Sequence, residues 1–296
     1  MLQAQGKGRE VIMKTGKSIQ IVTLMLIVGL LSIASLGCSK ATEATTTPKQ
    51  EIVVKIGTTS DEPRVWEAIG KKLAQDNIKI KIVNFANGAN PNQALANGDI
   101  DLNSFQHYAY FNKNKSDLKL DLTPIGDTII VPLSLFSKKV KSVDQLTEGA
   151  KIAIPNDITN IGRSLNVLKN AGIIKLKDGV GATPTLKDIT SNPLKIQFVE
   201  LAQAQIARSL TDVDAAIINC GYAVDAGLDP IKDPIFADKI DISDPNQQPY
   251  INIIVARTAD KDNAVYKKIV KAYQSEDIAK VISQVYKGAS IPAWTK

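Results

Sequence analysis

Three polar residues of this sequence have the chemistry needed to hold a small zwitterion. Arg163 stands near the start of a predicted helix, where its guanidinium and the backbone N–H groups can share one carboxylate. Asn160 and Asn219 offer amide oxygens to an ammonium group and amide hydrogens to a carboxylate. Taken by position alone, the arginine reads equally well as a surface ion-pair partner, and each asparagine as a turn or cap residue.

A cluster of rings precedes these residues in a chain with only 5% aromatic residues: Phe105, His107, Tyr108, Tyr110 and Phe111. A thioether side chain gains roughly 0.3–1.5 kcal/mol from each contact with an aromatic ring. The cluster therefore predicts an apolar slot suited to a sulfur-bearing side chain. The alternatives are an ordinary core phenylalanine and a structural histidine.

The candidate residues share one property, which is that each follows a predicted strand. The three strands cover residues 100–105, 151–154 and 215–219, and the candidates that follow them are Phe105, Gln106, His107, Tyr110, Asn156, Asn160, Arg163, Asn219 and Tyr222. Ligands of open α/β sheets bind beyond the carboxyl ends of the strands. We therefore expect these side chains to converge on one site.

Strands and helices alternate along the chain, which predicts α/β architecture with right-handed crossovers. Further strands are expected at 52–57, 78–85 and 196–201, and helices at 62–75, 92–96, 159–170 and within 262–286. We expect two lobes, each a mostly parallel sheet flanked by helices: residues 51–137 and 250–296 form lobe 1, and residues 138–249 form lobe 2. Residues 128–136 and 250–256 cross between them. A single larger doubly wound sheet is the alternative.

The N-terminus predicts export. Lys14 and Lys17 precede an uncharged run that ends at Cys38, and the centre of that run, residues 21–31, is almost wholly apolar. We expect a signal peptide at 1–37, lipidation of Cys38 and a flexible, Thr-rich tether over 38–50. Translation starts at Met1 or Met13, and an uncleaved membrane anchor is the alternative.

Composition limits the other classes of function. The net charge of +6 is spread over lysines that alternate with acids, which does not favour nucleic acid as a partner. Two cysteines and one histidine exclude a zinc ribbon or a multi-disulfide scaffold, and no cofactor or metal site is expected. An enzyme would need Cys220 with His107, or Asp99 with Asp101, which read more simply as turn residues. A surface adhesin without a small-molecule site is a further alternative.

Five motifs resemble the methionine-binding lipoprotein family of ABC importers. They are NSFQHYAY at 103–110, IPND at 154–157, NIGRSL at 160–165, IKLKDGVG at 174–181 and PYIN at 249–252. The similarity runs from about Val53 to Trp294. It implies a two-lobed, periplasmic-binding-protein-like type II fold that closes on methionine, with no catalysis, and it implies a permease and an ATPase as partners.

Matching motif positions imply roles for individual residues. Phe105, His107 and Tyr110 would line the side-chain pocket, with Tyr250 as a further wall, and Asn160, Arg163 and Asn219 would hold the head group. The sequence departs from the family within residues 219–222, where a hydroxyl residue is expected in place of Cys220 or Gly221. The resemblance implies a monomeric, lipid-anchored protein outside the cytoplasmic membrane that takes methionine, and the sequence does not choose between L-methionine and D-methionine. Another small amino acid, a methionine-containing dipeptide, or a membrane-anchored hydrolase remains the alternative.

Overall fold

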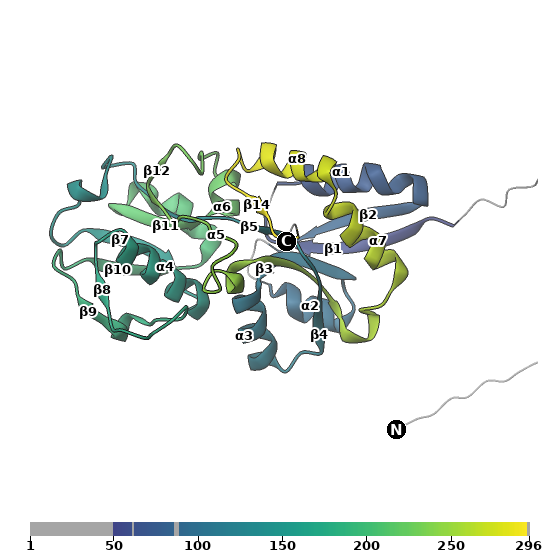
Figure 1. The fold of residues 1–296 in the computed structure, drawn as a ribbon, viewed down its shortest axis with the longest axis horizontal. Helices are drawn as coiled ribbons and strands as arrows, with labels where there is room; N and C mark the ends of the chain where they lie inside the picture. The colour runs from purple at the N-terminus through teal and green to yellow at the C-terminus, as the bar shows by residue number, and fades with distance from the viewer. Residues whose placement is uncertain (1–49, 61, 86–88, 295–296) are drawn as a thin grey trace, which may run out of the picture. The chain divides into compact units, whose positions relative to one another are not determined.

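Two separate five-stranded sheets organise the protein, as seen in a computed structural model that describes residues 50–60, 62–85 and 89–294 (Figure 1). The α/β fold predicted from the strand–helix alternation is confirmed, and the alternative of one larger sheet is wrong. The predicted signal peptide, Cys38 and the tether up to residue 49 lie outside the described residues. Within the described residues, no helix is long and apolar enough to cross a membrane.

The first sheet has the strand order β2-β1-β3-β13-β4. Its strands are β1 (Ile52–Thr58), β2 (Ile78–Asn84), β3 (Leu102–His107), β4 (Leu122–Asp127) and β13 (Asn252–Arg257). β1 pairs in parallel with β2 and β3, whereas β13 is antiparallel to β3 and β4.

The second sheet has the order β10-β7-β11-β6-β12. Its strands are β6 (Leu133–Phe136), β7 (Lys151–Pro155), β10 (Gln197–Leu201), β11 (Ala215–Asn219) and β12 (Pro234–Ala237). β7 is parallel to β10 and β11, and β6 is antiparallel to β11 and β12.

In each sheet four of the five strands run in the same direction, and only β13 or β6 runs opposite to the rest, so the mostly parallel sheets predicted from the sequence are confirmed. A strand that runs parallel to the preceding strand of its sheet needs a helical crossover between them. No such crossover precedes β6 or β13, because the chain passes into β6 directly from the first sheet and into β13 directly from the second. Both strands are antiparallel to their neighbours. β6 also lies in the second sheet, although the predicted lobe boundary assigned residues 51–137 to lobe 1. The predicted crossing segments at 128–136 and 250–256 do connect the two sheets. A short pair, β5 (Ile129–Ile130) with β14 (Ile291–Pro292), lies on the same passage.

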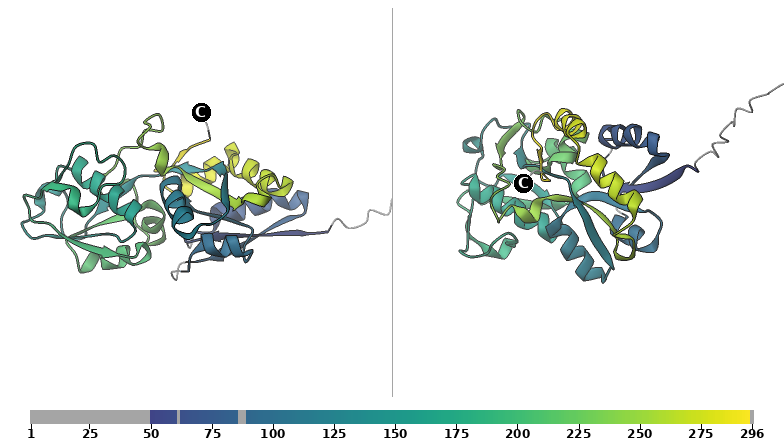
Figure 2. Two further views of the ribbon diagram at one scale, coloured as in Figure 1. Left: turned by 90° about the horizontal axis from the view of Figure 1, so that it is seen from below. Right: turned by 45° about the vertical axis from the view of Figure 1, so that its right-hand side comes forward.

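Helices cover both faces of the first sheet (Figure 1). α1 (Arg64–Leu73), α7 (Ala264–Tyr273) and α8 (Glu276–Val285) bury Ile69, Ile269 and Ile282 against one face. The right-hand view of Figure 2 shows the yellow α7 and α8 beside the dark blue α1. α2 (Pro91–Asn97) and α3 (Tyr108–Leu118) pack Leu95 and Phe111 against the opposite face.

The second sheet is covered in the same way. α4 (Ile158–Asn170) packs Leu165 and Leu168 on one face, and α5 (Gln203–Ile206) and α6 (Cys220–Asp225) bury Ile206 and Ala223 on the other. The remaining elements are β8 (Lys175–Leu176), β9 (Ile189–Ser191) and the 3₁₀ helices η1 (Ala74–Asp76), η2 (Val143–Gln145), η3 (Leu186–Asp188), η4 (Ala207–Thr211), η5 (Gln248–Tyr250) and η6 (Thr258–Asp260).

Candidate functional site

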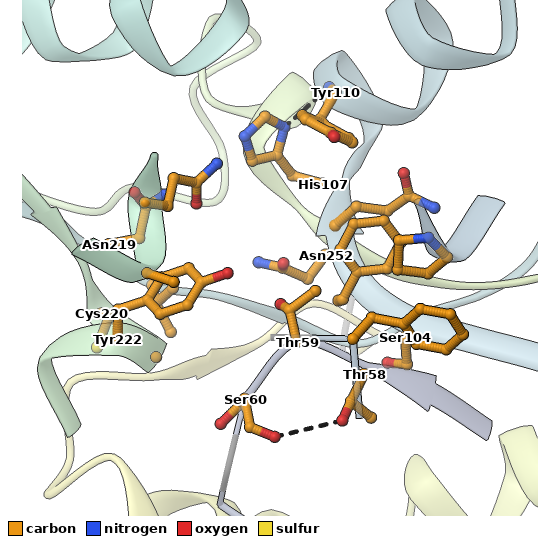
Figure 3. Close-up of a pocket in the computed structure, with 18 of the residues that line it drawn as sticks. Thr58, Thr59, Ser60, Ser104, His107, Tyr110, Asn219, Cys220, Tyr222 and Asn252 are labelled. Atoms are coloured by element: carbon orange, nitrogen blue, oxygen red, sulfur yellow. Dashed lines mark hydrogen bonds between the residues drawn. The ribbon is translucent and has the colours of Figure 1, made fainter. Parts of the chain in front are cut away.

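A cavity of about 380 Å³ lies where the carboxyl ends of strands from both sheets meet. In Figure 3, His107 at the end of β3 and Tyr110 on α3 stand opposite Asn219 at the end of β11 and Tyr222 on α6. The structure brings six of the seven predicted site residues to this cavity: Phe105, His107, Tyr110, Asn160, Arg163 and Asn219. Their convergence follows from the strand-end rule used on the sequence.

The N-terminal turns of α4 present two of these residues. Asp157 caps the helix and accepts a hydrogen bond from the Asn160 backbone N–H at 3.0 Å. Asn160 and Arg163 are three residues apart and therefore share one helix face. Both carboxylate oxygens of Asp157 also accept bonds from the Asn160 side-chain amide, at 3.0 Å each, which fixes the orientation of that amide.

Arg163 is a buried cation, only 3% exposed. One guanidinium nitrogen donates to the Val131 carbonyl at 2.6 Å, and the group lies 4.6 Å from the centre of the Tyr250 ring. Its Nε has no hydrogen-bond partner, and none of the ion pairs among the described residues includes it. Burial lowers the pKa of Arg163, with the charge of Asp238 acting in the opposite direction. A buried charge without a paired acid is costly unless an anion joins it.

A chain of side chains joins the three predicted clusters. The Asn219 side-chain amide donates to Asn160 Oδ1 at 2.9 Å, and the Nε2 of His107 lies 3.4 Å from the same oxygen. The Oδ1 of Asn219 is buried and has no partner among the described residues. The site thus holds an unpaired donor on Arg163 and an unpaired acceptor on Asn219, which suits a ligand that carries both a carboxylate and an ammonium group.

His107 is neutral at physiological pH. Burial, assisted by the nearby positive charge of Arg163, lowers the pKa of His107 to about 4. Its Nδ1 accepts the Tyr110 backbone N–H at 3.2 Å and so caps α3. The proton of the neutral ring therefore belongs on Nε2, which can donate it to Asn160.

The aromatic residues divide into two groups. Phe105 and Tyr110 line the cavity with ring centres 5.8 Å apart. Tyr250 was predicted as a further wall of the pocket. It is not one of the described residues that line this cavity, and its ring lies against Arg163 and His107 instead. Its hydroxyl donates to the Ala182 carbonyl at 2.9 Å, which turns the ring into that supporting position.

Several residues at the cavity were not among the candidates from the sequence: Thr58, Thr59, Ser60, Ser104, Gln203 and Asn252. In Figure 3, Thr58 and Ser60 lie below His107, and Asn252 lies near the middle. Thr58 ends β1 and Asn252 begins β13. The strand-end argument, applied to β1 as it was to β3, β7 and β11, would have identified Thr58.

The enzyme alternative finds no support in the geometry. Burial raises the pKa of the Cys220 thiol to about 12, so this residue is not a ready nucleophile. Asp101 accepts the Lys55 backbone N–H at 2.8 Å, and neither Asp99 nor Asp101 lines the cavity. No group of three or more potential metal ligands occurs among residues 50–60, 62–85 and 89–294.

Two sheets joined by crossing strands, with a buried arginine and amides at the cavity between their strand ends, define a two-lobed solute-binding protein. The chain belongs to the NlpA lipoprotein family, whose family model matches residues 54–294. The resemblance identified from the sequence motifs is therefore confirmed.

Individual relatives agree with this assignment. The chain is 38% identical over 267 residues to the D-methionine-binding lipoprotein MetQ of Escherichia coli K12, covering 89% of this chain and 94% of the relative. It matches the crystal structure of the methionine-binding protein MetQ with a TM-score of 0.77 and 39% identity, over 82% of this chain and 99% of that one. A nutrient-binding protein from Burkholderia cenocepacia bound to methionine gives a TM-score of 0.75 and 39% identity, over 81% and 100% of the two chains.

Proposed function

We propose that this protein captures methionine outside the cytoplasmic membrane and delivers it to the permease of an ABC importer. The observation that carries the proposal is the buried guanidinium of Arg163, which lines the cavity without an acidic partner within 4.0 Å among the described residues. The names of the relatives, which bind methionine or D-methionine, support the same ligand.

The head group of the ligand would be held by the second sheet. Its carboxylate would pair with Arg163, and its ammonium group would donate to the unpaired Oδ1 of Asn219. Asn160 lies between these groups and the first sheet, because it bonds to Asn219 and reaches His107. Each charge-assisted hydrogen bond contributes about 1.5–3 kcal/mol.

The side chain of the ligand would be held by the first sheet. Phe105 and Tyr110 offer ring faces and edges, and the neutral ring of His107 closes the slot without adding charge. Burial of a methionine-sized side chain contributes about 1.5–3 kcal/mol. Together with three or four head-group bonds, this reaches the roughly 8 kcal/mol of micromolar binding after ordering costs. Tyr250 would act by holding Arg163 and His107 from behind.

The remaining parts of the proposal concern where the protein acts. Membership of a lipoprotein family and the apolar run ending at Cys38 support an acylated N-terminus that anchors the protein on the extracytoplasmic side. A monomer on a tether can reach a permease in the same membrane, and the permease in turn engages its ATPase.

The proposal is tested by thermal shift with the twenty amino acids and D-methionine, followed by calorimetric titration. A ligand at 100 times its dissociation constant raises stability by about 2.7 kcal/mol. We expect methionine to give the largest shift. A larger shift with a methionine-containing dipeptide would reassign the ligand, and no shift with any of these compounds would contradict the proposal. Turnover of methionine esters or peptides would favour a hydrolase.

A further inference from the structure

Three buried amide side chains form a hydrogen-bond cluster between α2 and β3, and Asn92 also donates to Asn114 on α3 at 2.9 Å. Asn92 lies on α2, and Asn103 and Gln106 lie on β3; their exposed fractions are 0%, 0% and 3%. Gln106 and Asn92 exchange hydrogen bonds of 2.6 and 2.8 Å, Asn103 donates to Asn92 at 2.9 Å, and Gln106 donates to Asn103 at 3.0 Å. Such an amide triad is fully paired and fixes the geometry of the groups that make it.

β3 contains one extra residue at this place. Gln106 pairs with Ile253 of β13, whereas Asn103 pairs with Val255. Three steps along β3 therefore match two steps along β13, so Ser104 and Phe105 stand together opposite Ile254. This is a β-bulge, a feature that re-aims side chains near functional sites.

The bulge explains how the amide triad can form. Residues three apart in a regular strand point to opposite faces, yet Asn103 and Gln106 both reach Asn92. Their partners Val255 and Ile253 pack on the face covered by α2 and α3, while Ile254 packs on the opposite face. The extra residue is what brings both amides to one face.

The same bulge determines what reaches the cavity. β1 pairs with β3 only as far as Asn103, so the rest of β3 is free of that neighbour. The four consecutive residues Ser104, Phe105, Gln106 and His107 all line the cavity, and Figure 3 labels Ser104 and His107 there. In a regular strand, Phe105 would share the face of Asn103 and point towards α2.

We infer that Asn92, Asn103 and Gln106 are positioning residues: their amide triad locks the bulge in β3 and thereby holds Phe105 and His107 at the ligand's side-chain slot. None of the hydrogen bonds that the triad makes to described residues reaches Asn160, Arg163 or Asn219. This inference rests on the proposed methionine function for its affinity readout but not for its spectroscopic one.

The test compares two matched substitutions in the complete mature protein. Gln106→Met keeps the length of the side chain and removes its three triad bonds. Gln274→Met is the control for the loss of an amide hydrogen bond, because Gln274 donates one bond to the Asp127 carbonyl at the end of β4. Gln106 itself lines the cavity, so Asn103→Ala, which alters a triad amide that does not line it, must show the same loss of affinity as Gln106→Met. We expect methionine affinity measured by calorimetry to fall by about tenfold or more in Gln106→Met and to change by less than about twofold in the control.

A second readout needs no ligand. His107 is the single histidine of the chain, so its imidazole NMR signals can be followed without ambiguity. We expect its pKa to move from about 4 towards the ordinary value of 6.5 in Gln106→Met, and to stay in the control. Asn103→Ala breaks the triad on the other side of the bulge, and the same readouts apply to it if Gln106→Met does not fold.

The inference is overturned if the triad variants keep the wild-type His107 titration, or if they bind methionine as tightly as Gln274→Met does. Failure of the wild-type protein to bind methionine would defeat the proposed function instead, and the His107 titration would still decide the role of the triad.

Discussion

Arg163 combines two properties that seldom occur together, a nearly complete burial and a guanidinium without an acidic partner among the described residues. The Val131 carbonyl and the Tyr250 ring hold it in place but do not neutralise it. A ligand carboxylate would complete the pair in a site of low dielectric, where each charge-assisted bond is strong.

Replacement of this arginine should therefore affect binding more than folding. We expect Arg163→Ala to weaken methionine binding by about 2 kcal/mol or more, measured by titration calorimetry. Arg208→Ala removes an exposed arginine from the same half of the protein and should leave the affinity unchanged. Equal affinities for the two variants would refute the role given to Arg163.

His107 makes stability depend on pH in a defined window. Its pKa is about 4 in the folded protein and near 6.5 when unfolded, because burial disfavours the charged ring. Between these values the unfolded chain binds a proton that the folded protein does not, so stability is lost as the pH falls from about 6.5 to about 4. The linkage amounts to roughly 2–4 kcal/mol.

This effect can be separated from that of the acids. We expect chemical denaturation of the wild type to show the loss between pH 7 and pH 4.5, and His107→Gln to show a much smaller one. Asp277, whose pKa is lowered to about 2 mainly by its hydrogen bond with Lys72, acts only at lower pH. The same slope in both proteins over that window would contradict the assignment to His107.

At the scale of elements, α4 is the part whose placement matters most, because it carries both Asn160 and Arg163. Gly162 lies between them and faces a backbone segment. A Cβ at Gly162 would stand 2.7 Å from the Thr183 Cα, a distance that requires one backbone to move. The adjacent Ala182 carbonyl accepts the Tyr250 hydroxyl, so that movement would reach the ring beneath Arg163.

Two glycine-to-alanine substitutions should therefore act in opposite directions. We expect Gly162→Ala to lower the free energy of unfolding by about 1–3 kcal/mol and to weaken methionine binding. Gly70→Ala in α1 has its nearest neighbour at 3.8 Å and should raise stability by about 0.5–1 kcal/mol. Denaturation and calorimetry measure both, and a stabilised Gly162→Ala would show that the segment at Thr183 yields easily.

At the scale of the whole molecule, the proposed ligand would join two halves that each bind a different part of it. The first half offers rings from β3 and α3, and the second half offers the guanidinium and amides from α4 and β11, so neither half alone holds a complete amino acid. Ionic contacts such as Lys287 with Asp229, at 3.6 Å, add a link between the C-terminal helices and the second half. Surface ion pairs of this kind contribute little to stability. We therefore expect a bound ligand to stabilise the association of the two halves more than this ion pair does.

The proposed membrane attachment would depend on one cysteine, Cys38. We expect Cys38→Ala to release the protein from the membrane fraction of cells, because the proposed acylation of that thiol would supply the anchor. Cys220→Ala serves as the control and should remain membrane-bound. If Cys38→Ala also stays with the membrane, the apolar run acts as an uncleaved anchor.

The sequence by itself determined the α/β class and the strands that end at the cavity, because strand length, helix start signals and strand ends are local properties. The same local signals identified the candidates that follow those strands: Phe105, His107, Asn160, Arg163 and Asn219. The sequence could not determine which strands run antiparallel, since β6 and β13 acquire their direction from the passage between sheets. The support position of Tyr250 depends on Ala182, 68 residues away in sequence.

The bulge in β3 likewise depends on Asn92, which lies in another element. The unpaired state of Arg163 is also a tertiary property, because it requires that no acid of the described chain comes within reach. Local patterns thus identified the chemistry, and long-range packing alone decided which of those groups are paired, which are buried and which face the cavity.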